Sequence, residues 1–119
     1  TIPHTPYTEG LFDSTKFVLM KNSAKFINIG RGMTTKLHDL NYALRSGQIG
    51  GAGLDVYEIE PLPEDHPLWD APNTILTPHT AALGGANLDE RRYEIVLENF
   101  RNFSNEKPLR NEVDKANWF

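Results

Sequence analysis

The chain has 119 residues, no cysteine, and a formal net charge of −4 at pH 7, from 12 Lys and Arg against 16 Asp and Glu. With 39% hydrophobic and 10% aromatic residues, it has the composition of a folded single domain. The missing cysteine excludes disulfide bonds and thiolate chemistry and fits a reducing compartment, so we expect a cytoplasmic protein. The negative charge and the lack of a long apolar run predict neither a nucleic-acid partner nor a membrane partner.

The first part of the chain predicts a loop, a short helix and a strand. Residues 1–8 contain two prolines and form the loop. Asp13 supplies an N-cap oxygen for a short helix, which ends near Lys21. The run 25–29 is rich in β-forming side chains and stops at the glycine turn Gly30-Arg31-Gly32.

A longer helix and a second strand are predicted next. Leu37, Leu40 and Leu44 have the spacing of one buried helical face, and a glycine shortly afterwards is expected to end the helix. Thr34 and Thr35 precede this face and are expected to cap it. The apolar, glycine-rich run 51–57 predicts a buried strand.

The remaining elements complete an alternating pattern of strands and helices. Residues 60–67 form a proline-stiffened loop, 74–77 a third strand, and 87–104 an amphipathic helix that includes Ile95, Phe100 and Phe103. The tail carries Trp118 and Phe119, which we expect to be exposed or packed on another copy. Strands separated by helices at this spacing predict an α/β fold with a parallel sheet.

Polar side chains follow each of the three predicted strands. Arg31 follows the first, Asp55, Glu58 and Glu60 the second, and His79 the third. Ligands of open parallel sheets bind outside the carboxyl ends of the strands, so Arg31, Glu60 and His79 are expected to converge in space.

Each of these residues also has a plain structural interpretation. Arg31 in a glycine turn can be a solvated surface charge, and Glu60 before a proline can be an exposed loop carboxylate. His79 can be a buried imidazole bonded to a backbone carbonyl. Asp55 can simply cap a neighbouring helix or turn.

Taken together, the same residues suit the reduction of a 2-oxo acid. A carboxylate beside an imidazole favours the imidazolium, which can protonate a carbonyl oxygen as hydride arrives at carbon. An arginine fork binds a carboxylate. The hydride must come from a cofactor. No metal-ligand spacing, Gly-x-Gly-x-x-Gly loop or Gly-x-Ser-x-Gly elbow is present, so no metal site is expected.

Three ordered motifs resemble the D-isomer-specific 2-hydroxyacid dehydrogenases, a family that includes glyoxylate/hydroxypyruvate reductases. These motifs are Asn28-Ile29-Gly30-Arg31-Gly32, Gly53-Leu54-Asp55-Val56-Tyr57-Glu58-Ile59-Glu60-Pro61-Leu62-Pro63 and Thr77-Pro78-His79-Thr80-Ala81. The resemblance implies that Arg31 orients the substrate, that His79 is the acid/base, and that Glu60 pairs with it. It also implies a set of residues around the cofactor: Pro3, Thr5, Ile29, Arg31, Asp55, His79, Ala81 and Ala82. Within this set, Pro3 and Thr5 are expected on the adenosine side and Asp55 at the nicotinamide end.

The resemblance further implies an incomplete cofactor domain. Residues 1–85 are expected to form the second half of a Rossmann-type NAD(P)-binding domain, and residues 86–119 a C-terminal helix and tail that return to an absent catalytic domain. The full-length protein is expected to be a homodimer that transfers a hydride between NAD or NADP and a small 2-oxo or 2-hydroxy acid. The 119-residue chain alone is expected to be inactive.

A non-catalytic, NAD(H)-sensing or corepressor-like binding protein is the alternative. Arg31, Glu60 and His79 are all in place, which argues against it, because a sensor needs no acid/base histidine. The sequence leaves open which 2-hydroxy acid is used and whether the cofactor is NAD or NADP.

Overall fold

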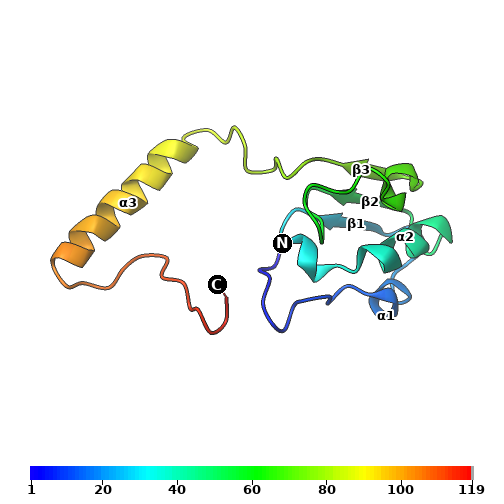
Figure 1. The fold of residues 1–119 in the computed structure, drawn as a ribbon, viewed down its shortest axis with the longest axis horizontal. Helices are drawn as coiled ribbons and strands as arrows, with labels where there is room; N and C mark the ends of the chain where they lie inside the picture. The colour runs from blue at the N-terminus through cyan, green and yellow to red at the C-terminus, as the bar shows by residue number, and fades with distance from the viewer. Residues whose placement is uncertain (119) are drawn as a thin grey trace.

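A three-stranded parallel sheet with helices packed beside it forms the centre of the structure, a computed structural model that describes residues 1–118 (Figure 1). Phe119 lies outside the described residues. The strand order is β1-β2-β3, and both neighbouring pairs are parallel. The predicted α/β class is therefore confirmed. In chain order the elements are α1 (Ser14–Phe17), β1 (Lys25–Asn28), η1 (Gly32–Thr34), α2 (Leu37–Arg45), β2 (Gly51–Leu54), η2 (Pro67–Asp70), β3 (Thr74–Leu76) and α3 (Leu88–Ser104).

The hydrophobic core lies on one face of the sheet, under α1, α2 and η2. It is formed by Phe17, Phe26, Leu37, Leu40, Ala43, Leu44, Ile49, Ala52, Leu54, Tyr57, Leu62 and Leu68. The predicted leucine face of α2 is thus confirmed as buried. Along β1, buried and exposed residues alternate, as they do when only one face of a sheet is covered. Ile27 and Ile75 on the other face are both largely exposed.

Helix α2 begins differently from the prediction. Its N-cap position is Lys36, which provides no side-chain cap, so the expected capping by Thr34 and Thr35 is wrong. Both threonine side chains are buried and accept hydrogen bonds from the Asn28 amide, at 3.4 and 3.2 Å. The first N–H of the helix donates instead to Oε2 of Glu58, at 2.7 Å. A carboxylate from the turn after β2 therefore replaces the local cap.

At the ends of the other elements, the structure confirms one predicted helix cap and shows shorter elements than predicted. Asp13 caps α1 as predicted, since its Oδ1 accepts the N–H groups of Thr15 and Lys16 at 3.0 and 3.3 Å. The predicted end near Lys21 is wrong, because α1 is a single turn that ends at Phe17. The strand predicted at 51–57 ends at Leu54, where the chain turns toward the site. The strands predicted at 25–29 and 74–77 each end one residue early, at Asn28 and Leu76.

Helix α3 stands away from the sheet, and the tail after it returns toward the N-terminus (Figure 1). The helix forms where it was predicted, but it contains no buried residue, and Phe100 and Phe103 are 69% and 76% exposed. The radius of gyration is 18.1 Å, whereas a compact chain of this length has about 13–14 Å. Within residues 1–118, no helix combines the length and apolar character needed to cross a membrane.

Candidate active site

Two of the three predicted catalytic side chains are in direct contact. Nδ1 of His79, in the turn after β3, lies 2.7 Å from Oε2 of Glu60, in the loop after β2. The two side chains are 48% and 35% exposed, so the pair faces a solvent-accessible space. Arg31, in the turn after β1, lies apart from the pair, and its Nη1 donates to the Gly30 carbonyl at 2.8 Å.

The electrostatics of the pair fix which nitrogen of His79 carries a proton. Partial burial alone would raise the pKa of the Glu60 carboxyl. The hydrogen bonds from His79 and from the Tyr57 N–H, together with the charges of His79 and Arg31, outweigh burial and hold this pKa below its ordinary value. Glu60 is therefore an ionised carboxylate, which only accepts hydrogen bonds. It follows that His79 Nδ1 donates to Glu60 and that Nε2 is left to act on another group.

Asp55 is buried and binds the turn that carries His79. Its Oδ1 accepts the Thr80 N–H and its Oδ2 accepts the Ala81 N–H, both at 2.8 Å, and the Thr77 hydroxyl also donates to Oδ1. The Thr77 bond, followed by the Thr80 bond, lowers the pKa of Asp55 to about 2. Of the interpretations open to Asp55, the structure therefore shows the turn cap. A further contact from Asp55 to the cofactor stays a prediction.

This cap supports an unusual backbone at His79. The residue has a φ of +53°, in the left-handed region, which costs a side-chain-bearing residue roughly 1–2 kcal/mol. Asp55 binds the next two N–H groups, and the His79 N–H itself donates to the Thr77 carbonyl at 3.1 Å. These bonds hold the strained residue in the orientation that brings its imidazole to Glu60.

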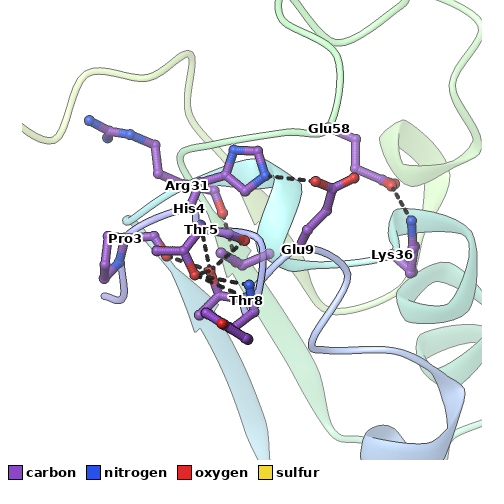
Figure 2. Close-up of polar contacts among 10 residues, drawn as sticks. Pro3, His4, Thr5, Thr8, Glu9, Arg31, Lys36 and Glu58 are labelled. Atoms are coloured by element: carbon purple, nitrogen blue, oxygen red, sulfur yellow. Dashed lines mark hydrogen bonds and ion pairs between the residues drawn. The ribbon is translucent and has the colours of Figure 1, made fainter. Parts of the chain in front are cut away.

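The loop before α1 contains two of the predicted cofactor residues, Pro3 and Thr5. Thr5 is buried, and its hydroxyl oxygen accepts the N–H groups of Tyr7 and Thr8, both at 3.2 Å. The Thr8 hydroxyl in turn donates to the Pro3 carbonyl at 2.7 Å (Figure 2). Thr5 therefore shapes this loop from beneath, whereas Pro3 remains at the surface.

An open cavity of about 590 Å³ lies between this loop and the turn after β1. It is lined by Thr1, Ile2, Pro3, His4, Gly30, Arg31 and Trp118. Figure 2 shows Arg31 beside Pro3 and His4 at this place. The Trp118 ring meets the His4 ring edge-on, with centroids 5.2 Å apart, so Trp118 is only half exposed. Residues 114 positions apart form this contact, and no local sequence signal indicated it.

A second cavity, of about 500 Å³, adjoins the His79–Glu60 pair. Its lining is mostly apolar and includes Leu62, Trp69 and Leu76 beside the pair. Ile29 is 50% exposed, and Ala81 and Ala82 are exposed after His79. Sequence patterns did not identify Leu62 and Trp69 as site residues, because an apolar side chain in a proline-rich loop or a short 3-10 helix carries no chemical signal of its own.

The residues present fit part of a dinucleotide site. Arg31 offers a cation beside an open cavity, and the loop around Pro3 offers backbone and ring surface. The sequence contains no Gly-x-Gly-x-x-Gly loop, so it lacks that means of holding a pyrophosphate. In residues 1–118, no three His, Asp or Glu side chains gather in a way that would hold a metal ion.

Comparison with known proteins gives a consistent set of relatives. Residues 1–81 match the family described as D-isomer specific 2-hydroxyacid dehydrogenase, NAD binding domain. Glyoxylate/hydroxypyruvate reductase A of Photorhabdus laumondii is 40% identical over 100 residues, which is 84% of this chain and 31% of that protein. Glyoxylate/hydroxypyruvate reductase B of Citrobacter koseri is 46% identical over 95 residues, which is 80% of this chain and 28% of that protein. The chain thus spans about a third of the length of these curated relatives.

Solved structures agree in fold. An NADPH-dependent glyoxylate/hydroxypyruvate reductase from Sinorhizobium meliloti, in complex with NADP and sulfate, matches with a TM-score of 0.88 and 35% identity, over 99% of this chain and 38% of that one. A D-isomer specific 2-hydroxyacid dehydrogenase from Xanthobacter autotrophicus Py2, in complex with NADPH and MES, has a TM-score of 0.87 and 38% identity, over 96% of this chain and 46% of that one.

Proposed function

We propose that this chain, which belongs to the D-isomer-specific 2-hydroxyacid dehydrogenase family, carries the acid/base and substrate-binding residues of a 2-oxo acid reductase. The observation that carries the proposal is the 2.7 Å hydrogen bond between His79 and Glu60 at the ends of adjacent strands, with the Arg31 charge contributing to the low pKa of Glu60. The names of its relatives, which are glyoxylate/hydroxypyruvate reductases, support small 2-oxo acids as the substrate class.

In the proposed reaction, His79 moves a proton while the substrate carbon is reduced. Nε2 of His79 donates its proton to the carbonyl oxygen, so that the carbonyl becomes a hydroxyl, and the reverse reaction returns the proton. Glu60 binds Nδ1 and stabilises the charged imidazole. Arg31 binds the substrate carboxylate through its planar fork. When bound, the dinucleotide supplies the hydride.

The cofactor is NAD or NADP, and the NADPH and NADP complexes of two related structures support NADP. Arg31 and His79 would contact both the substrate and the cofactor. The Pro3 loop, with Thr5 beneath it, would line the adenosine side. The residues that would hold the cofactor are Pro3, Thr5, Ile29, Arg31, Asp55, His79, Ala81 and Ala82.

We also infer that residues 1–85 and 86–119 are separate units of a cytoplasmic protein that is a homodimer in its full-length form. The 13.5 kDa chain exposes 8610 Å², whereas a compact monomer of this mass exposes about 6,500 Å². This excess supports association with further protein surface. Light scattering of the full-length protein is expected to give twice the mass of one chain, and a single-chain mass would contradict the homodimer.

Steady-state kinetics of the full-length protein with glyoxylate, hydroxypyruvate and pyruvate test the reaction. His79→Ala is expected to lower kcat by at least about a hundredfold, because it removes the acid/base. His38→Ala is the matched control, since that side chain is 93% exposed, and it should leave kcat within twofold. Turnover of His79→Ala within a few-fold of wild type would contradict the assignment. NADH-dependent reduction by the 119-residue chain alone would contradict its expected inactivity.

A further inference from the structure

Tyr57 lies where the three turns of the candidate site meet. It follows β2, three residues before Glu60, and its side chain is only 6% exposed within the core. Its backbone and its hydroxyl make separate contacts with the segments that carry the three proposed catalytic residues. The mechanism proposed above uses none of these contacts.

The first contact joins Tyr57 to the turn of Arg31. The next residue in that turn, Gly32, is buried, and a Cβ atom added to it would lie 1.9 Å from the Tyr57 carbonyl oxygen and 2.4 Å from the Tyr57 nitrogen. No side chain fits at such distances, so the two backbones are packed directly against each other. This packing fixes the position of the Arg31 turn relative to the carboxyl end of β2.

The second contact joins Tyr57 to Glu60. The Tyr57 N–H donates to Oε1 of Glu60 at 3.0 Å, while Oε2 of the same carboxylate accepts from His79. The two oxygens are thus divided between a fixed backbone donor and the imidazole. With Oε1 held, the carboxylate cannot rotate away from His79 without breaking a hydrogen bond.

The third contact joins Tyr57 to the turn of His79. The Tyr57 hydroxyl lies 2.9 Å from the Thr77 carbonyl and 3.3 Å from the Leu54 carbonyl, across the ends of β3 and β2. The Thr77 carbonyl also accepts the N–H of His79. Burial, together with the charge of Asp55, raises the pKa of Tyr57, so its hydroxyl remains a donor.

We infer that Tyr57 is a positioning residue that sets Arg31, Glu60 and His79 in register through its peptide, its N–H and its hydroxyl. The catalytic consequence rests on the proposed function, whereas the effect on the His79–Glu60 pair does not. In this role Tyr57 acts through the three side chains and not through a contact of its own with substrate or cofactor.

Tyr57→Phe tests the inference, because it removes the hydroxyl and keeps the ring. Tyr42→Phe is the matched control, since Tyr42 is 66% exposed on α2. In the 119-residue chain, NMR of the His79 ring follows the Nδ1–H proton that is bonded to Glu60. We expect Tyr57→Phe to accelerate the exchange of this Nδ1–H proton with water at least tenfold and to leave the circular dichroism spectrum unchanged. We expect Tyr42→Phe to leave the exchange rate as in wild type.

Kinetics of the full-length protein provide the second readout. Tyr57→Phe is expected to lower kcat about tenfold with KM within twofold, and to displace the pH profile of kcat. 3-Fluorotyrosine at position 57 keeps the hydroxyl and should retain wild-type exchange and turnover.

The outcomes separate the two proposals. Unchanged His79 exchange in a folded Tyr57→Phe chain would overturn the positioning role, whatever the activity. An unfolded Tyr57→Phe chain would also overturn it, by making the hydroxyl a requirement for folding. If His79 exchange depends on Tyr57 while the full-length protein reduces no 2-oxo acid, the positioning role stands and the proposed function fails.

Discussion

The sheet unit (residues 1–81) and the α3 arm (residues 88–118) differ in what covers their apolar side chains. Every residue buried in the described part of the chain lies in the sheet unit, which also carries the candidate site. The α3 arm contributes none, although its helix is the longest in the structure. Both regions contain aromatic residues, so composition does not explain the contrast. Burial requires a facing surface, and helix α3 has none among the described residues, although Trp118 at the end of the arm packs edge-on against His4.

Local interactions account for the helix in the arm. Asp89 and Glu90 lie in its first turn and Arg101 in its last, which complements the helix dipole. Asn99 exchanges two hydrogen bonds with the Arg110 backbone, at 2.9 and 2.7 Å. Interactions of this kind stabilise secondary structure by a few tenths of a kcal/mol each, far less than burial of a core side chain.

A pair of phenylalanines tests the contrast with the largest expected effect. Phe17 is fully buried and Phe103 is 76% exposed. Phe17→Ala is expected to lower the free energy of unfolding by about 3–5 kcal/mol, because it leaves a cavity. Phe103→Ala is expected to change it by less than about 0.5 kcal/mol. Urea denaturation followed by circular dichroism measures both, and equal losses would refute the contrast.

A pair of glycines tests how tightly the sheet unit is packed around the site. A Cβ on Gly32 would overlap the Tyr57 backbone, whereas one on Gly53 would find its nearest neighbour at 3.9 Å. Gly32→Ala is expected to cost about 2–3 kcal/mol through overpacking. Gly53→Ala is expected to be within about 1 kcal/mol of wild type. Thermal unfolding distinguishes them, and a neutral Gly32→Ala would show that the turn can move.

Lowering the pH is expected to have a smaller effect on the stability of the sheet unit. The pKa of Asp55 is about 2 in the folded chain, below its ordinary value of 3.8. A carboxyl with a depressed pKa stabilises the fold above its ordinary pKa, and this contribution is lost as pH falls from about 4 toward 2. The urea midpoint of wild type should therefore fall over this range.

The Asp55→Asn variant should lack this component of the pH dependence. Asp114→Asn is its counterpart in the α3 arm. The Asp114 carboxyl also has a lowered pKa, through Asn117 and the Ala116 N–H, but it lies in an exposed turn of the tail. Its substitution should leave the urea midpoint of the sheet unit unchanged at every pH. An acid response that survives in Asp55→Asn would assign the effect to another group.

Features set by neighbouring residues were predicted well from the sequence. The Asp13 cap and the leucine spacing of α2 predicted these helical features correctly. The alternation of strands and helices, with glycine turns between them, predicted the parallel sheet correctly. The convergence of Glu60 and His79 followed from the rule that polar residues after parallel strands meet at one edge.

Apart from the Glu60–His79 contact, features that depend on one particular distant partner were not predicted. Thr34 and Thr35 have the right identity for caps, but Asn28 binds them, and Glu58 caps α2 across 21 positions. The spacing of apolar residues in α3 correctly predicted the helix and its apolar side. This spacing carries no information on whether another surface covers that side. The contacts of Tyr57 could likewise not be predicted from the sequence, because each involves a different turn.

Hydrogen exchange of the 119-residue chain, resolved by residue, tests most directly whether the sheet unit supports the site without help from the α3 arm. Amides of β1, β2 and α2 are expected to exchange only through global unfolding, while those of α3 exchange at least about a hundredfold faster through local fraying. The amides of Thr80 and Ala81, bound by Asp55, should share the protection of the sheet unit. Protection of α3 equal to that of β2 would contradict the account.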